Sequence, residues 1–590
     1  MQTRIAVTSS PNTTQVVNFD VLQEHLLQPI LGTLLQASMT IQTPNGAQEL
    51  LILGQATSLE TRNQFHEDPV FKGVIKIQGE IPYLTKDGNL SVGALNIIGA
   101  YVKGEDGGYV KTHLSVPPGA GLSLRPVDAG LIHELMAGDP AFGFLGSFYG
   151  TKDVPAPVNL RHFGDYDDGG YGEAYMGGVF GPSGSGKSVL AATLLGLWSH
   201  QKRLGMLILD PQEEFSHNKF ATGSQFQFNF FQLLKTMSGR FDPLAQIIRI
   251  ADIQLEGTDI FMQILHEKNF FSDGLGVSNA KMEDALRNVE VYLRSLDGWQ
   301  PWKSWTQCDL SGDFSLGLIK AVVQTYAVTN RDTQQEAYQN NMDKNQKRIA
   351  EIWDSATEFF KDAMPVTGVK KKQLRAIMDD VLSHGAIYIL NLQTDLGTSF
   401  KTYLVDLVVR KLREVCSANF RMDKNPTNAL VVLDEAGRFI PAQTRDDDKL
   451  AVLSKRIVDS VREMRKMRCG FLFITQTINE IQKDIFRNLH FRIYGVGLGV
   501  GSDAEHMIAR EGKNAFEVYQ TLPDPRLSRI FSYMVAGTLL TLGSSGLPLV
   551  IEGYSGGDQI LKENGHLSTP TKNNASNTQS SPDPAPGASS

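Results

Sequence analysis

The spacing of hydrophobic and polar positions changes along the chain and divides it into segments. Up to about residue 150, short β-branched runs alternate with glycine turns, as in Ser38–Thr43, the turn at 44–46 and the returning run Glu49–Leu53. The alternation continues through Gly73–Ile81. Patterns of period two that are separated by glycine turns are typical of antiparallel strands. Residues 1–150 are therefore predicted to form a small N-terminal β-barrel.

The next segments predict an α/β domain. Prolines and glycines interrupt any period in residues 151–175, which are predicted to be a linker. Mostly apolar runs then recur between stretches of helical spacing, at 176–180, 206–210, 386–392, 429–433 and 471–474. Such runs are typical of parallel strands that are covered on both faces. The chain is therefore predicted to contain a RecA-like core in two parts, 176–219 and 381–555.

The two core parts flank a polar segment, 220–380, whose apolar residues recur at helical spacing. It is predicted to be a helical insertion. Within it, Lys370–Lys372 is a dense basic run that either contacts a DNA backbone or begins a solvated helix. At the other end of the chain, residues 556–590 are rich in small and polar residues. Residues 571–590 contain no core-forming run, which predicts a disordered tail.

The most informative motif is the sequence GPSGSGKS from Gly181 to Ser188, which matches the phosphate-binding P-loop pattern G-x-x-x-x-G-K-[ST]. A predicted strand precedes it and a predicted helix follows it. Glycines let the loop curl so that its backbone N–H groups surround phosphate. The lysine is expected to reach the β- and γ-phosphates, and the final serine to ligate Mg²⁺. The predicted ligands are ATP and Mg²⁺, and the predicted binding residues are Gly181, Gly184, Ser185, Gly186, Lys187 and Ser188.

Acidic and amide side chains follow three other predicted strands. Asp434 and Glu435 form a Walker B pattern, in which Asp434 is expected to hold Mg²⁺ and Glu435 to polarise the attacking water. Gln476 is expected to sense the γ-phosphate or to orient water, or else to cap its strand. Asp210, with Glu213 or Glu214, is expected near the phosphates because ligands bind at the carboxyl ends of parallel strands. Solvated acids in a strand-end turn are the alternative interpretation.

A basic helix at 457–467 precedes the strand that ends at Gln476. Arg462 and Arg465 on this helix are predicted to act in trans on the nucleotide of a neighbouring subunit, as arginine fingers do. Surface charges on a helix are the other interpretation. Arg487 and Arg492 are weaker candidates for the same role.

Composition narrows the possible classes of protein. A chain of 590 residues is too long for a single core. Its three cysteines lie far apart, which argues against a disulfide framework and suits a reducing cytosol. No apolar run is long enough to span a membrane, so a cytoplasmic protein with no membrane contact is expected. The net charge of −8 means that any contact with DNA has to be local, such as the lining of a pore.

The combination of these features resembles the HerA ATPases in the FtsK/HerA branch of P-loop motors. The resemblance rests on the barrel, the P-loop, the motif Asp210–Phe215, the long insertion, Leu433–Glu435 and Thr475–Gln476. It implies nucleotide and catalytic roles for Lys187, Ser188, Asp434, Glu435 and Gln476. Asp210 and Glu214 match the acidic motif of the family less closely, because the family more often has Gly-Glu-Tyr where this chain has Glu-Glu-Phe.

The resemblance also implies a function and partners. HerA ATPases form hexameric rings that pump double-stranded DNA through a central channel, and their barrels dock a partner, typically the NurA nuclease. The sequence therefore predicts an ATP-hydrolysing DNA translocase or helicase, a homo-hexamer that works with a nuclease or another effector in DNA end processing and repair. One alternative is the ATPase of an antiviral defence complex that gates an effector. Another is a motor for conjugation or type IV secretion.

Overall fold

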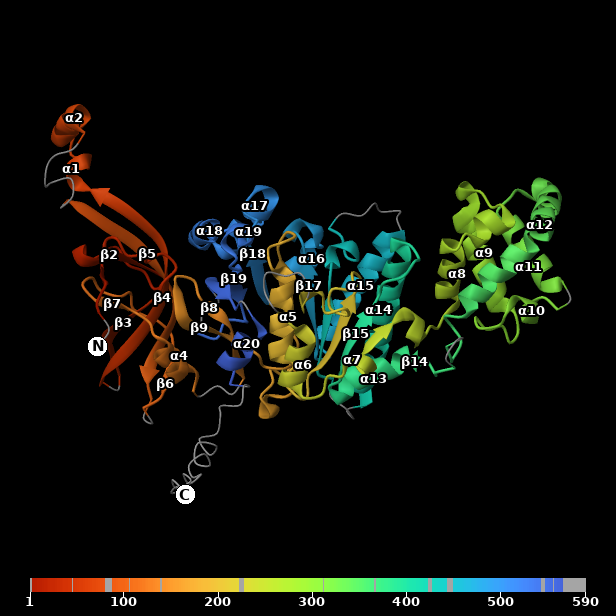
Figure 1. The fold of residues 1–590 in the computed structure, drawn as a ribbon, viewed down its shortest axis with the longest axis horizontal. Coiled ribbons are helices and arrows are strands. Elements are labelled where there is room, and N and C mark those ends of the chain that lie inside the picture. Colours follow the sequence, from red (N-terminus) through yellow and green to blue (C-terminus); the bar gives the residue numbers. More distant parts are fainter. Residues whose placement is uncertain are drawn as a thin grey trace, which may run out of the picture.

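The computed structural model describes residues 3–565 except 45, 80–87, 105–106, 138–140, 222–227, 311, 365–367, 423–426, 443–448, 543–546 and 555. A β-barrel, a large central sheet with its helices, and a helical bundle follow one another along the longest axis of the molecule (Figure 1). The predictions of a turn at residue 45 and of disorder at 571–590 fall outside the described residues. The α/β fold with an N-terminal barrel is confirmed.

The barrel is a closed antiparallel sheet with the strand order β2-β1-β7-β3-β4-β5, in which β5 pairs back with β2. Gly93 of β5 lies opposite Phe19 of β2 at this closure, and a Cβ on Gly93 would approach the Phe19 ring to 2.3 Å. The glycine therefore lets the aromatic ring fill the interior. The strands are β1 (Ala6–Thr8), β2 (Val16–Val21), β3 (Leu34–Thr43), β4 (Gly46–Asn63), β5 (Asn89–Lys103), β7 (Ser123–Pro126), and β6 (Tyr109–Thr112), which pairs antiparallel with the end of β5.

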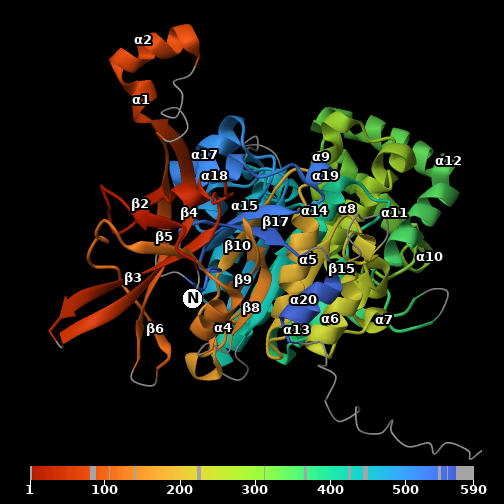
Figure 2. The same ribbon diagram turned by 60° about the vertical axis from the view of Figure 1, so that its left-hand side comes forward.

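The connection between β4 and β5 differs from the prediction. The alternating run Gly73–Ile81 was expected to be a strand, but α1 (Gln64–Glu67) and α2 (Pro69–Gln78) occupy this connection. The Asp68 side chain accepts a hydrogen bond from Val70 N, proline is the first helical residue, and Gly79 ends the helix. These start and stop signals outweigh the alternation. Both views show α1 and α2 projecting from the barrel (Figures 1 and 2).

The barrel is fixed to the central sheet by buried hydrogen bonds. The side chain of Gln55 in β4 donates to the Val550 carbonyl at 3.1 Å and accepts from Val550 N at 3.0 Å. The Tyr101 hydroxyl of β5 donates to the Leu542 carbonyl. A buried, satisfied amide at this junction disfavours sliding of one part against the other, because displacement would leave polar groups unpaired.

The central sheet has the order β12-β15-β11-β16-β17-β10-β18-β19-β20-β8-β9. From β12 to β18 the neighbours are parallel, and from β18 to β9 they are antiparallel. The strands are β8 (Phe142–Phe148), β9 (Thr151–Asn159), β10 (Met176–Phe180), β11 (Gly205–Asp210), β12 (Ile247–Arg249), β15 (Ile387–Asn391), β16 (Ala429–Leu433), β17 (Cys469–Thr475), β18 (Phe491–Gly495), β19 (Ser532–Gly537) and β20 (Leu549–Gly553).

Helices cover both faces of this sheet. Consecutive residues of one strand, such as Leu207 and Ile208, point to opposite faces and belong to different hydrophobic clusters. One face packs against α5 (Lys187–Trp198) and α6 (Phe230–Ser238), and the other against α13 (Leu374–His384), α14 (Thr398–Met422), α15 (Lys449–Arg465) and α16 (Lys483–Arg487). The parallel strands are thus buried on both sides, as their mostly apolar runs predict.

The boundaries predicted around the sheet differ from the structure on the barrel side. Residues 151–159, predicted to be part of a linker, form β9, and β8 also joins the central sheet. Pro155 and Pro157 are tolerated there because β9 is the edge strand, where a missing N–H leaves no ladder bond unmade. At the other end, α20 (Gly557–Glu563) buries Ile560 and Leu561, so folded chain continues past residue 556.

The helical insertion is shorter than predicted. Within 220–380, α6 and β12 belong to the core, and the bundle itself is built from α8 (Thr258–Glu267), α9 (Met282–Ser295), α10 (Trp305–Cys308), α11 (Asp313–Val323) and α12 (Arg331–Thr357). Its centre is aromatic: the Trp353 ring lies 4.8 Å from that of Phe261 and 5.4 Å from that of Trp305.

Two short parallel strands form the base of the insertion, β13 (Ile253–Gln254) and β14 (Lys372–Gln373). The basic run lies here, and two of its lysines are engaged in the fold. Lys371 is buried and donates to the Glu358 carbonyl, while Lys372 donates to the Ala245 carbonyl at 2.8 Å. Lys371 is therefore not a solvated side chain, whereas Lys372 is exposed.

Candidate nucleotide-binding site

The P-loop connects β10 to α5 and is held from outside by an antiparallel strand. Gly184 and Gly186 have φ angles of 87° and 83°, which favour glycine. The Tyr533 hydroxyl on β19 donates to the Gly186 carbonyl at 2.9 Å, and a Cβ on Gly186 would lie 2.5 Å from that hydroxyl. The loop is therefore fixed in its curled form by the protein itself.

The interior of the loop fits a phosphate group. The Ser185 hydroxyl is buried and has no hydrogen-bond partner within the described part of the chain. Lys187 is also buried, and its Nζ lies 3.9 Å from Glu435 Oε1. A buried cation and an unpaired hydroxyl beside the N-terminus of a twelve-residue helix favour an anion. Ser188, in the first turn of α5, is half-buried.

The acidic residues gather at the carboxyl ends of β11 and β16, which are neighbours in the sheet. Burial raises the pKa of Asp434 well above its usual value, and the charges of Glu214, Asp210 and Glu435 raise it further. A divalent cation would remove this repulsion, because it interacts favourably with each ionised carboxylate. Asp434 and Ser188 therefore fit a Mg²⁺ ion whose remaining ligands come from phosphate and water.

The motif that begins at Asp210 forms a buried turn. Asp210 Oδ1 accepts from Glu214 N at 3.1 Å, and its Oδ2 accepts from Ser216 N and Oγ, both at 2.7 Å. Glu213 accepts a hydrogen bond from the Asn391 amide at 3.0 Å. Glu214, by contrast, acts electrostatically on Asp434. Of Glu213 and Glu214, Glu214 is the one whose charge raises the pKa of Asp434, while Asp210 stabilises the turn that carries it.

Glu435 is held by side chains from three different elements. Its own backbone is left-handed, with φ of 50°, directly after β16. The Gln476 amide donates to both of its carboxylate oxygens, at 3.3 and 3.4 Å, and Arg438 Nε lies 3.7 Å from Oε2. With Lys187 on the third side, the buried carboxylate is fixed beside the P-loop. The side chains predicted for catalysis within one subunit thus meet at a single place.

Glu480 supports this arrangement from behind. Its Oε2 accepts hydrogen bonds from Thr475 Oγ1 at 2.6 Å and from Gln476 N at 3.1 Å. These bonds fix the backbone at the end of β17. Gln476 is therefore free to use its side-chain amide on Glu435 rather than to cap the strand.

Residues 177–412 match the family model described as "Helicase HerA, central domain". These residues form a HerA-type central domain. The match includes the P-loop and Asp210 and ends before the Walker B strand. It confirms the predicted resemblance to the HerA family over these residues.

Other comparisons give weaker overlaps. Comparison with curated proteins finds no significant match. VirB4 of Thermoanaerobacter pseudethanolicus overlaps with a TM-score of 0.36 at 14% identity, over 70% of this chain and 97% of that chain. The bacterial conjugative coupling protein TrwB overlaps with a TM-score of 0.37 at 12% identity, over 73% and 92% of the two chains. With TM-scores this low, nothing about function follows from these overlaps.

The two arginines predicted to act in trans, Arg462 and Arg465, have different surroundings in the structure. Arg462 is 41% exposed and pairs with the exposed Asp484, at 3.1 Å. Arg465 contacts His490 at 3.2 Å, and His490 in turn accepts a hydrogen bond from Met176 N. Met176 begins β10, so Arg465 lies at the opposite end of this strand from the P-loop. Arg492, a weaker candidate, is buried in an ion pair with Glu511.

Two further arginines near the site were missed in the sequence. Arg438 follows Glu435 by three residues, so its spacing from the Walker B acids is a signal that could have indicated it. Arg526, in α19 (Pro525–Ser528), lies beside the P-loop, since a Cβ on Gly184 would be 3.4 Å from its Nε. No local pattern links Arg526 to the P-loop, because the sheet order alone brings them together.

Within the described residues, no helix is both long and apolar enough to cross a membrane.

The environment of Asp434 leads to a prediction. Because its pKa is raised by folding, the ionised carboxylate destabilises the fold increasingly as pH rises above the value of about 3.9 expected in the unfolded chain. Asp434→Asn is therefore expected to raise the apparent Tm in Mg²⁺-free buffer at pH 8 and to abolish ATP hydrolysis. The gain in Tm should shrink as the pH approaches 4. Thermal melts across this pH range measure it, and an unchanged or lower Tm at pH 8 would contradict the assignment.

Proposed function

We propose that the chain is an ATP-driven motor that moves along double-stranded DNA as a homo-hexamer. The observation that carries the proposal is the convergence of Lys187, Glu435 and Gln476 at the end of a P-loop in a HerA-type domain. A carboxylate fixed next to a phosphate-binding lysine suits water activation, which a motor requires and a small-molecule kinase avoids.

The roles of the residues follow from their positions. The P-loop N–H groups, Ser185 and Lys187 bind the phosphates of ATP. Ser188 and Asp434 would hold Mg²⁺. When bound, this ion would neutralise negative charge on the phosphate oxygens. Glu435 accepts the proton of the attacking water, while Gln476 and Arg438 orient its carboxylate. Gln476 also reports the state of the γ-phosphate to the loop that Glu480 fixes.

The experiment that tests this function measures three properties of the full-length chain. Size-exclusion mass with an ATP analogue and Mg²⁺ should correspond to a hexamer. ATP hydrolysis should rise when duplex DNA is added, and the protein should displace a third strand from a duplex track in an ATP-dependent manner. A monomer whose ATP hydrolysis ignores duplex DNA would refute the proposal.

A nuclease such as NurA, or another effector, docked on the barrel completes the proposal. It is supported by α2, none of whose side chains is buried, although Val70 and Ile77 are apolar and are 77% and 86% exposed. A ten-residue helix is marginal in water unless it packs against something. Co-elution of the ring with such a nuclease tests this part.

Arg462 is proposed as the residue that acts in trans, because its exposed ion pair with Asp484 is weak enough to exchange for a phosphate. Arg462→Ala is expected to leave ATP binding and ring assembly intact and to lower kcat by about 10³-fold or more. Mixing Arg462→Ala with Glu435→Gln subunits should restore part of the hydrolysis, because some interfaces then combine an intact Glu435 with an intact Arg462.

The matched control for this test is Arg413→Ala, which removes an equally exposed arginine that pairs with Glu463 on α15. It should hydrolyse ATP at the normal rate. Mixed rings that stay inactive would assign the trans role elsewhere.

A further inference from the structure

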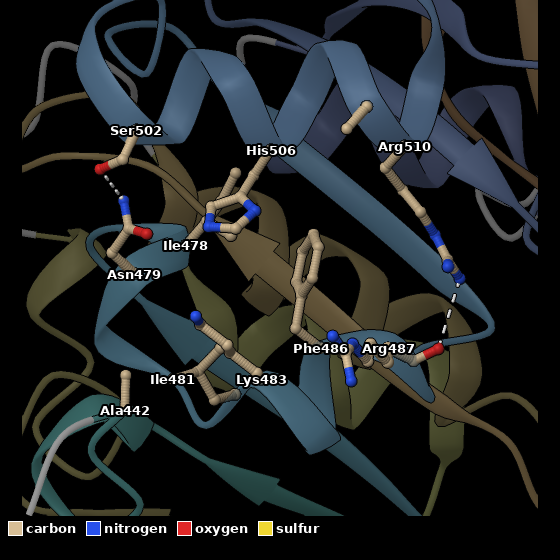
Figure 3. Close-up of a pocket in the computed structure, with 11 residues that line it drawn as sticks. Ala442, Ile478, Asn479, Ile481, Lys483, Phe486, Arg487, Ser502, His506 and Arg510 are labelled. Atoms are coloured by element: carbon tan, nitrogen blue, oxygen red, sulfur yellow. Dashed lines mark hydrogen bonds between the residues drawn. The ribbon is translucent and has the colours of Figure 1, made fainter.

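A pocket of about 740 Å³ lies one loop away from the nucleotide site (Figure 3). Its walls are the short 3₁₀ helix Ile478–Glu480 after β17, α16, and α17 (Gly501–Glu511). The floor is apolar and consists of Ile478, Ile481 and Phe486, all of which are buried. His506 of α17 faces this floor, with its ring 6.0 Å from that of Phe486.

Three cations line the pocket, and within the described residues none of them has an ion-pair partner. Lys483 and Arg487 come from α16 and Arg510 from α17, and none of the lining residues is acidic. Across the described ranges, no carboxylate pairs with any of these three side chains. The one hydrogen bond among them joins Arg510 Nη2 to the backbone carbonyl of Arg487, at 3.5 Å. Neighbouring Arg462, by contrast, is neutralised by Asp484. Among the described residues, the pocket therefore carries three cations without ion-pair partners over an apolar floor.

The walls of the pocket connect directly to the residue that contacts Glu435. Asp503 of α17 accepts hydrogen bonds from Ile478 N at 3.0 Å and from the Asn479 amide at 2.8 Å. Glu480, at the end of the same turn, fixes Gln476 N. A displacement of α17 is thus transmitted through one hydrogen-bonded turn to Gln476.

We propose that this pocket binds the phosphodiester backbone of DNA. Unpaired cations of this number favour a polyanion, and the apolar floor fits the deoxyribose between two phosphates. The inference rests on the proposed DNA motor and deepens it by naming the surface that grips the track. An acidic protein segment is the other partner with suitable charge, and the test below distinguishes it.

DNA bound in this pocket would also influence the ATP site. A backbone seated between α16 and α17 contacts both walls of the pocket. The walls reach Gln476 through Asp503 and Glu480, so DNA binding and the orientation of Glu435 are coupled. This coupling explains, within the proposed function, how duplex DNA would stimulate hydrolysis.

The test uses the full-length chain with Lys483, Arg487 and Arg510 all replaced by glutamine. The matched control replaces Arg294, Lys347 and Arg348, which are exposed and ion-paired on the helical bundle, with the same change in net charge. Anisotropy of a labelled duplex is measured in a saturating ATP analogue and Mg²⁺, between about 50 and 200 mM salt. The slope of log K against log salt is expected to fall by about 2 to 3 in the triple variant, because each lost phosphate contact contributes about 0.9. The control should keep the wild-type slope.

Each other outcome overturns the inference in a recognisable way. Wild-type binding that responds to salt, together with an unchanged slope in the triple variant, would place the DNA elsewhere and leave the motor intact. A loss of ring assembly without a change in DNA binding would indicate an acidic protein partner. A collapse of DNA-independent hydrolysis would mean that the cations serve a neighbouring nucleotide. A wild-type chain that does not bind duplex would refute the motor and the pocket together.

If the triple variant does not fold, Arg510→Gln alone should lower the slope by about 1.

Discussion

Replacing Glu435 with glutamine is expected to lower kcat for ATP hydrolysis by about 10²- to 10⁴-fold while ATP binding is retained. Glutamine preserves the size of the side chain and a hydrogen bond with Gln476, but it cannot accept a proton from water. It also removes a negative charge 3.9 Å from Lys187, so affinity for the triphosphate should not fall. Steady-state hydrolysis and titration with a fluorescent ATP analogue in Mg²⁺ measure the two effects separately.

The control for this variant is Glu213→Gln, which makes the same change at a carboxylate that accepts a hydrogen bond from Asn391. That hydrogen bond lowers the pKa of Glu213 and holds its side chain toward β15. Because the side chain is held there, the variant should hydrolyse ATP at close to the normal rate. Hydrolysis by Glu435→Gln at the wild-type rate would remove Glu435 from the mechanism.

The second large effect concerns stability. Arg492 on β18 and Glu511 at the end of α17 form an ion pair in which the side chains are 8% and 2% exposed. Tyr494 donates to the same carboxylate at 2.9 Å, and Arg492 Nη1 donates to the Leu489 carbonyl at 3.0 Å. Arg492→Met is expected to cost about 3–5 kcal/mol, because it leaves a buried carboxylate without its counter-charge. The shift of the core's unfolding transition in denaturant measures this loss.

Two companions make this test specific. The double variant Arg492→Met, Glu511→Leu should recover most of the lost stability, since it removes both buried charges together. Lys513→Ala breaks a nearby but exposed pair with Glu517 and should change stability by less than about 0.5 kcal/mol. A single variant as stable as the wild type would show that the pair contributes little.

Local patterns in the sequence were sufficient to predict the parallel strands β10, β11, β15, β16 and β17 and the polar side chains that follow them. The P-loop, Asp434, Glu435 and Gln476 could be identified because each follows a mostly apolar run, and parallel strands bring their carboxyl ends to one edge. The choice between Glu213 and Glu214 could not be made in this way. It depends on a left-handed residue at Glu213 and on a hydrogen bond from Asn391, which is distant in sequence.

Where prediction differed from the structure, a tertiary arrangement outweighed a local pattern. Pro155 and Pro157 indicated a linker, but β9 is an edge strand and tolerates both. Arg462 and Arg465 lie one helical turn apart and were equivalent in the sequence. Their surroundings differ in the structure, because Arg465 contacts His490 at the amino end of β10. Arg526 lies beside the P-loop because of the order of the strands in the sheet, and no spacing in the sequence indicates this proximity.

The base of the insertion has a consequence for how such chains can diversify. Ile253 and Lys372 are paired in β13 and β14, so the chain leaves the core and returns to it at adjacent points. Everything between these points can lengthen, shorten or be exchanged without shifting the register of a single strand of the central sheet. The bundle can therefore be replaced as a unit while the core that carries the P-loop stays constant.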